Sequence, residues 1–201
     1  MTSTRVAIVD SGGANIASLT YALDRLGIEN TLTLDARTIR AASHVILPGV
    51  GAAADAMHRL NSNGLAEVIT ALNQPVLGIC LGMQLLARTS AEDTTKCLGI
   101  VPATAEKLRA STAIPVPNMG WCQVDQSAPH ALFAGIENGS YFYFIHSFAL
   151  PLGEYSLAQA GHSDPFTAVL AQENFFATQF HPERSAAAGS KLLSNFAGLA
   201  S

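Results

Sequence analysis

The chain has 201 residues, of which 49% are hydrophobic and 13% are charged, and its formal net charge is −4. This length and composition predict one domain spanning residues 1–201, and the absence of a lysine and arginine cluster argues against nucleic-acid binding. The first apolar run, residues 6–10, is too short for a secretory signal or a membrane span. A cytoplasmic protein with no membrane partner is therefore expected.

The number and spacing of the cysteines limit the roles that they can have. Cys80, Cys97 and Cys122 are an odd number and do not have the spacing of metal ligands. We expect no disulfide framework, no metal site and no cofactor. A cysteine that matters to function should act as a free thiol.

The first half of the chain alternates short apolar runs with segments of helical period, which is typical of a largely parallel sheet with crossover helices. Residues 6–10 predict a strand, and residues 16–26 predict a helix that Gly27 terminates. Further strands are predicted at residues 29–34, 44–47 and 76–79. Helices are predicted at residues 52–60 and 65–72, and another begins at Leu81.

The second half is richer in strand-forming sequence. Strand-like stretches occur at residues 100–108, around Gln123, and at residues 141–145, 157–160, 168–171 and 175–179, before a helical tail at residues 186–199. These stretches suit antiparallel or mixed additions to the sheet. The predicted fold class is α/β, with helices on both faces of a mixed, largely parallel sheet.

The segment Gly78-Ile79-Cys80-Leu81-Gly82 lies where a buried strand should meet a helix. This spacing predicts a nucleophile elbow, in which a strained turn exposes the nucleophile and flanking glycines remove side chains that would collide with it. The N-terminus of the following helix favours a thiolate, and the Leu81 N–H could receive an oxyanion. An inert buried cysteine is the alternative, and it suits Cys97 and Cys122 better.

A nucleophilic thiol needs a base, and His181 is the histidine best placed to supply it. In Gln179-Phe180-His181-Pro182-Glu183 it follows a strand-like run, and Pro182 stiffens the turn so that Glu183 can fold back on one ring nitrogen. The other nitrogen should then face sulfur. Alone, the tripeptide His181-Pro182-Glu183 is weak evidence and could be a solvated turn, but together with the cysteine elbow it becomes strong evidence.

A third element is Pro48-Gly49-Val50-Gly51, at the end of another predicted strand. Its glycines allow backbone N–H groups to turn toward a ligand, so it could complete an oxyanion hole. Taken alone, it reads more readily as an ordinary glycine turn.

Together these motifs resemble the class I, or triad, glutamine amidotransferases, and most of all the glutaminase subunits of imidazole glycerol phosphate synthase. Met119-Gly120-Trp121 and His146-Ser147-Phe148 add to the resemblance, which covers nearly the whole chain. It implies a flavodoxin-like three-layer sandwich and hydrolysis of L-glutamine to glutamate and ammonia.

The resemblance also implies residue roles. Cys80 would attack the amide, His181 would transfer protons, and Glu183 would orient His181. The oxyanion hole would use Val50 and Leu81, and glutamine would be bound by Gly49, Gly51, Gln84, Glu92, Ser147 and Phe148. Glu92 would pair with the α-ammonium group.

The implied partner is a (β/α)8-barrel cyclase subunit that receives the ammonia and forms a heterodimer with this chain. Asn15, Met119 and Trp121 would face it. Such glutaminases are nearly silent until the cyclase binds its ribonucleotide, and the hypothesis here is that Val50 is the switch.

Several residues depart from the family pattern: the Ser11 to Ala14 segment, Asn118, Cys122 and Phe148. The first three lie toward the expected partner face or its neighbourhood, so they concern docking and coupling and not the triad. Two alternatives remain open: a glutaminase that serves another pathway, and a non-catalytic module in which Cys80 senses redox state. His44, His58, His130 and His162 read as structural or surface residues, and His146 as either a residue near the pocket or a core histidine.

Overall fold

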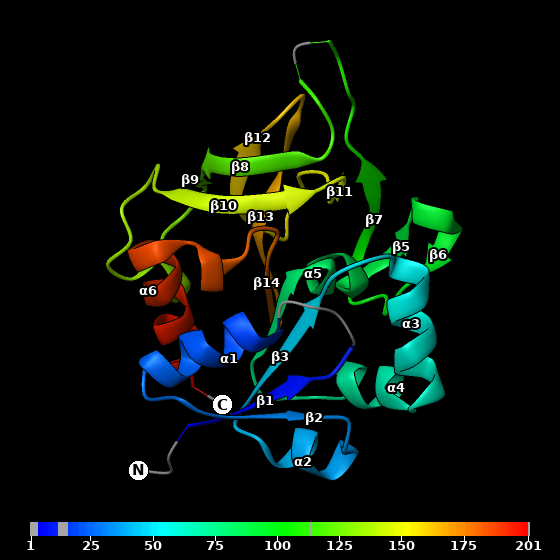
Figure 1. Ribbon diagram of the computed structural model, residues 1–201, viewed down its shortest axis with the longest axis vertical. Coiled ribbons are helices and arrows are strands. Elements are labelled where there is room, and N and C mark those ends of the chain that lie inside the picture. The colour runs from blue at the N-terminus through cyan, green and yellow to red at the C-terminus, as the bar shows by residue number, and fades with distance from the viewer. Residues whose placement is uncertain (1–3, 12–15, 113, 201) are drawn as a thin grey trace.

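The computed structural model describes residues 4–11, 16–112 and 114–200. Its centre is an eight-stranded sheet in the order β2-β1-β3-β4-β14-β13-β12-β9 (Figure 1). The strands are β1 Arg5–Val9, β2 Glu29–Thr33, β3 His44–Gly49, β4 Val76–Cys80, β9 Asp125–Gln126, β12 Ser156–Gly161, β13 Pro165–Gln172 and β14 Phe175–Thr178. The five strands from β2 to β14 are parallel, and the remaining three are antiparallel additions.

The other strands of the described residues form two smaller sheets. A two-stranded ribbon pairs β8, Asn118–Gln123, with β10, Tyr141–His146, in antiparallel register. The other sheet has the order β11-β7-β5-β6, with β5 Ala87–Ser90, β6 Thr95–Lys96, β7 Val101–Lys107 and β11 Phe148–Ala149. The expected strands near residues 100–108 and 141–145 are thus confirmed, but they lie outside the central sheet.

The helices are α1 Ile16–Arg25, α2 Ala36–Ala41, α3 Ala53–Ser62, α4 Leu65–Thr70, α5 Leu81–Leu86 and α6 Ala186–Ala197. Short 3-10 turns span Glu92–Thr94, Ala131–Phe133 and Pro182–Arg184. Gly27 has a φ of +69° just after α1, which confirms it as the helix stop. No helix in the described ranges is long and apolar enough to cross a membrane.

The sheet separates two apolar cores. Along β1, Val6 and Ile8 pack on one face while Ala7 and Val9 pack on the other, as the two-residue period of a strand requires. One core takes in α1, α6 and the β8-β10 ribbon, and the other takes in α3, α4, α5 and the four-stranded sheet. Helices therefore cover both faces, as the sequence predicts.

Candidate active site

The site lies at the carboxyl edge of the parallel strands. Strand β4 ends at Cys80, and β14 pairs with it in parallel, with Thr178 opposite Ile79. His181 follows β14 within three residues, so the register brings it to the same edge as Cys80. Parallel strands present their carboxyl ends together, and for this reason such edges commonly hold ligand sites.

The backbone at Cys80 has the predicted elbow conformation. Its φ of 54° and ψ of −109° lie outside the regions that side chains usually allow, and α5 begins at the next residue. A β-carbon added at Gly82 would lie 1.8 Å from the Leu47 carbonyl oxygen, and one at Gly78 would lie 2.8 Å from the Gly82 oxygen. Both glycines are therefore required by close backbone contacts around the turn.

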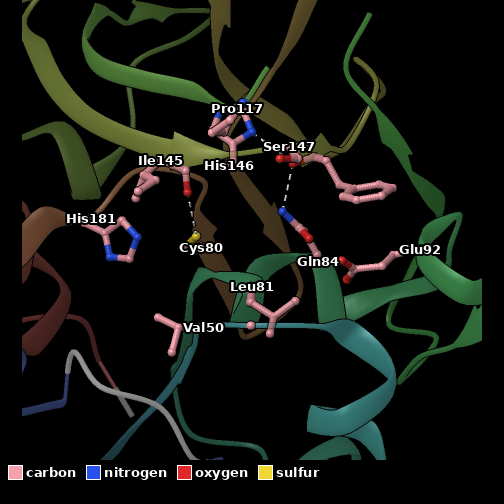
Figure 2. A pocket seen from close by; sticks show the side chains of 12 residues that line it. Val50, Cys80, Leu81, Gln84, Glu92, Pro117, Ile145, His146, Ser147 and His181 are labelled. Atoms are coloured by element: carbon pink, nitrogen blue, oxygen red, sulfur yellow. Dashed lines mark hydrogen bonds between the residues drawn. The ribbon is translucent and has the colours of Figure 1, made fainter. Parts of the chain in front are cut away.

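His181 and Glu183 form a buried pair. The His181 Nδ1 is 2.8 Å from Glu183 Oε1, and their side chains are 4% and 3% exposed. The Nε2 atom is then the nitrogen left for the thiol, and Figure 2 shows the His181 ring beside Cys80. Burial lowers the pKa of His181, but hydrogen bonds with Cys80 and Glu183 outweigh it and raise that pKa to about 10.

The backbone of His181 is fixed on both sides. Its N–H donates to the Tyr143 carbonyl of β10 at 2.9 Å, and its carbonyl accepts from the Ser185 hydroxyl at 2.6 Å. The same hydroxyl accepts from the Tyr143 N–H at 3.0 Å. The ribbon that carries Tyr143 thus sets the position of the imidazole.

A cleft of about 330 Å³ opens onto the sulfur. Most of the predicted oxyanion and substrate residues line it: Val50, Gly51, Leu81, Gln84, Glu92, Ser147 and Phe148. Gly49 differs from them, because a β-carbon there would meet the Leu81 β-carbon at 2.9 Å, which places it against the elbow and not among the lining residues.

Polar groups are distributed along the length of the cleft. Figure 2 shows His181 and Glu92 at opposite ends, with Cys80 and Gln84 between them. The Glu92 carboxylate accepts from the Ala53 N–H at 2.7 Å, at the start of α3, which fixes its position. An elongated polar substrate could therefore meet a thiol at one point and an anion at another.

Comparisons with known proteins agree with this geometry. The model of the family "Glutamine amidotransferase class-I" matches residues 7–198. "Imidazole glycerol phosphate synthase subunit HisH 2" of Legionella pneumophila strain Lens is 50% identical, covering 98% of both chains. The HisH subunit of Shewanella oneidensis is 45% identical, covering 95% of this chain and 94% of that one. This chain belongs to the class-I glutamine amidotransferases, in the HisH family.

The fold of this glutamine amidotransferase has relatives among solved structures as well. A structure described as a GMP synthase subunit from Thermoplasma acidophilum superposes with a TM-score of 0.75 at 22% identity, covering 98% of this chain and 94% of the other. At that identity the likeness concerns the fold alone. It confirms the α/β sandwich that the motifs predict.

Sequence reasoning assigned no role to several residues that line the amidotransferase cleft or contact the sulfur beneath it. Pro117, which follows a cis peptide bond, and Ile145 line it, and the Ile145 carbonyl lies 3.7 Å from the Cys80 sulfur. Gln179 lies 3.8 Å from the same sulfur and is fully buried. No local motif signals these contacts, since each depends on strands brought together from distant parts of the chain.

His146 satisfies both interpretations left open for it. It lines the cleft, yet it is only 5% exposed and its Nδ1 is 2.9 Å from the Phe148 carbonyl oxygen. Its Nε2 is 3.0 Å from the amide nitrogen of Asn118, whose oxygen is 3.5 Å from the Cys122 sulfur. Burial lowers the pKa of His146 to about 4. Two of the departures from the family pattern thus contact each other.

The residues predicted to face a partner lie on the β8-β10 ribbon. Met119 and Trp121 are 61% and 51% exposed on the outward face of β8, and Trp121 packs edge-on against Tyr143. Asn15 lies outside the described residues. Of the histidines interpreted as structural, His44 is buried within 3.1 Å of the Leu199 carbonyl.

Proposed function

We propose that this chain is the glutaminase subunit of imidazole glycerol phosphate synthase, acting as one domain over residues 1–201 in the cytoplasm. It supplies ammonia for the formation of imidazole glycerol phosphate and AICAR in histidine biosynthesis. The HisH names of relatives at 50% and 45% identity support this assignment. The observation that carries it is the strained Cys80 beside the buried His181–Glu183 pair, at the wall of a cleft.

The chemistry begins with attack of the Cys80 thiolate on the side-chain carbonyl of glutamine. His181, charged through its contacts with Cys80 and Glu183, gives its proton to the departing nitrogen, so ammonia leaves and a thioester remains. His181 then takes a proton from water, which attacks the thioester, and collapse of the tetrahedral intermediate expels the Cys80 thiolate beside the recharged His181. Glutamate is released and the enzyme is restored. Glu183 keeps Nε2 of His181 directed at the reaction throughout.

The oxyanion of each tetrahedral intermediate requires donors near the elbow. We assign the Leu81 N–H, which follows the nucleophile directly, and the Val50 N–H on the facing loop. Gly51 next to it has a φ of +91° and open space around it, so this loop can change conformation at low steric cost. A Gly51→Ala variant strains the loop without a clash and is a cleaner probe of a Val50 switch than a change at Gly49.

Substrate recognition follows from the ends of the cleft. Glu92 is fixed at one end by α3 and carries the charge that an α-ammonium group needs. Gln84 lines the cleft between the sulfur and Glu92, and the Ser147-Phe148 segment supplies the opposite wall. Gly51 lies on the loop, and Gly49 supports the elbow. A cleft of about 330 Å³ suits a ligand as small as one amino acid.

The proposed partner is the (β/α)8-barrel cyclase, which docks on the face that carries Met119 and Trp121, with Asn15 also assigned to it. Aromatic residues and methionine are enriched at protein interfaces. Docking here places the partner over the ribbon that fixes His181 through Tyr143. Ammonia can then pass between subunits without entering bulk water.

The test measures glutamate release by the purified chain alone, with the cyclase, and with the cyclase and its ribonucleotide. We expect strong stimulation in the third mixture and loss of it in a Cys80→Ser variant. Unchanged turnover in Cys80→Ser, or stimulation by the synthase of a different pathway in place of this cyclase, would refute the assignment.

A further inference from the structure

The buried amide of Gln179 connects the thiol to the wall of the cleft. Gln179 lies between β14 and His181, and its side chain is fully buried. Its Nε2 is 3.8 Å from the Cys80 sulfur, and its Oε1 is 3.1 Å from the Gln84 Nε2. None of the roles assigned above involves Gln179.

The direction of these hydrogen bonds is fixed by an atom that can only accept. The Gln84 Nε2 lies 2.8 Å from the Phe148 carbonyl oxygen, so this end of the Gln84 amide must be the donor. The same nitrogen contacts Gln179, which therefore presents its oxygen to Gln84 and its NH2 group to sulfur. A carbonyl in the cleft wall thus determines that an N–H points at the nucleophile.

The other neighbours of the sulfur show why such a donor matters. The Ile145 carbonyl, 3.7 Å away, accepts a hydrogen bond from the neutral thiol but repels a thiolate. His181 favours the thiolate as a charged donor. The Gln179 NH2 group adds a donor from another direction and offsets the carbonyl.

We infer that Gln179 is a catalytic residue that donates a hydrogen bond to the Cys80 thiolate, in an orientation set by Gln84 and the Phe148 carbonyl. The inference rests on the proposed glutaminase function, in which Cys80 is the nucleophile. Sulfur accepts hydrogen bonds more strongly once it is charged, so the contact stabilises the reactive form most. The other titratable groups of the site are His181, Glu183, His146 and Glu92, and none of them is altered in the test.

The test follows alkylation of Cys80 by iodoacetamide as a function of pH on the full chain. Peptide mass spectrometry separates Cys80 from Cys97 and Cys122. In Gln179→Met the side chain keeps its unbranched shape and loses the donor. Thr178→Val is the matched control, because the neighbouring Thr178 is also fully buried and donates to the Phe180 carbonyl at 2.9 Å.

We expect the pH of half-maximal alkylation to rise by about 0.5 to 1 in Gln179→Met, which slows the reaction at neutral pH by about threefold to tenfold. At high pH the rates should converge, since the thiolate is then fully formed. Thr178→Val should follow the parent curve. A Gln179→Met curve that superimposes on the parent, or an equal shift in Thr178→Val, would overturn the inference.

Melting curves check that each variant is folded, and Gln179→Asn, too short to reach the sulfur, carries the same test should Gln179→Met not fold. Alkylation requires no glutamine. A missing shift therefore rejects the role of Gln179 and leaves the glutaminase proposal standing, whereas a shift in a chain without glutaminase activity rejects the proposed function alone.

Discussion

At the scale of single residues, the site depends on glycines near the nucleophile as much as on the reactive side chains. Gly82 allows α5 to start directly beside β3, because any β-carbon there would overlap the Leu47 carbonyl oxygen at 1.8 Å. That neighbour is backbone within a buried strand and cannot rotate away. The position of Cys80 is thus determined by packing two residues further along the chain.

This packing predicts that Gly82→Ala lowers the free energy of unfolding by about 2 kcal/mol or more, since backbone must shift to relieve the overlap. Urea denaturation measures the change. Gly161→Ala is the matched control, because nothing lies within 4 Å of its added β-carbon, and it should be close to neutral. Equal stability of the two variants would show that the elbow tolerates a side chain.

The Glu183 carboxylate is predicted to keep His181 both charged and oriented. In Glu183→Gln we expect the pKa of His181 to fall from about 10, because a neutral amide stabilises the imidazolium less, and glutaminase turnover to fall about a hundredfold or more. NMR titration of the imidazole and turnover against pH measure the two effects. The exposed Glu154→Gln is the control, and an unchanged His181 titration would contradict the prediction.

Much of the site could be predicted at this scale, because Cys80, His181 and Glu183 lie in short motifs whose chemistry is local. The role of Gln179 could not be recognised from a local motif. Its contacts are with Cys80 and Gln84, across the β4–β14 pairing, and one sequence does not reveal which strands pair.

At the scale of elements, the β8-β10 ribbon has two different faces. Phe142 and Phe144 point into the core, while Met119 and Trp121 point outward, as strand alternation requires. We predict that Met119→Ala and Trp121→Ala weaken cyclase binding by about 2 kcal/mol each and leave the melting temperature nearly unchanged, since neither residue is in the core.

Calorimetric titration with the cyclase measures this loss of affinity. Leu32→Ala on the edge strand β2 is the control, because Leu32 is 44% exposed on an element remote from the ribbon in Figure 1. Normal affinity of Trp121→Ala for the cyclase would show that the docking face lies elsewhere.

The elements most accurately predicted were the buried parallel strands, whose apolar runs are bounded by turn residues. Helix α2 was missed although Asp35 caps it through the Thr38 N–H, a local signal that was available. Strand β5 was missed for a different reason. It is polar in part and pairs with β7 in a satellite sheet, so neither its period nor its composition identified it.

At the scale of the whole molecule, the position of β14 between β4 and β13 is the feature of the topology that assembles the active site. It returns the chain to the centre of the sheet after the ribbon and the antiparallel strands have formed, and it delivers His181 to Cys80. The sequence predicted β4 and β14 as strands but did not predict that they lie next to each other. The described residues of this single predicted domain form two apolar cores, because a sheet covered on both faces divides its apolar side chains.

The buried histidines predict how stability depends on pH. The pKa of His146 is lowered from 6.5 to about 4 by burial, so between these values the unfolded chain binds a proton that the folded chain does not. Stability should therefore fall as the pH falls from about 6.5 to about 4, by about 3 kcal/mol from His146 alone. Burial also lowers the pKa of His44 and His130, which adds to the same slope.

Urea denaturation at a series of pH values measures this slope, and His146→Gln isolates the contribution of His146. An amide does not titrate in this range, so the variant should lose stability less steeply on acidification, while retaining the part due to His44 and His130. The two curves should approach each other toward about pH 4, where the parent has lost the advantage of its neutral imidazole. Parallel curves over the whole range would mean that His146 takes up its proton without unfolding, with the Asn118 amide turning its oxygen toward Nε2 to accept it.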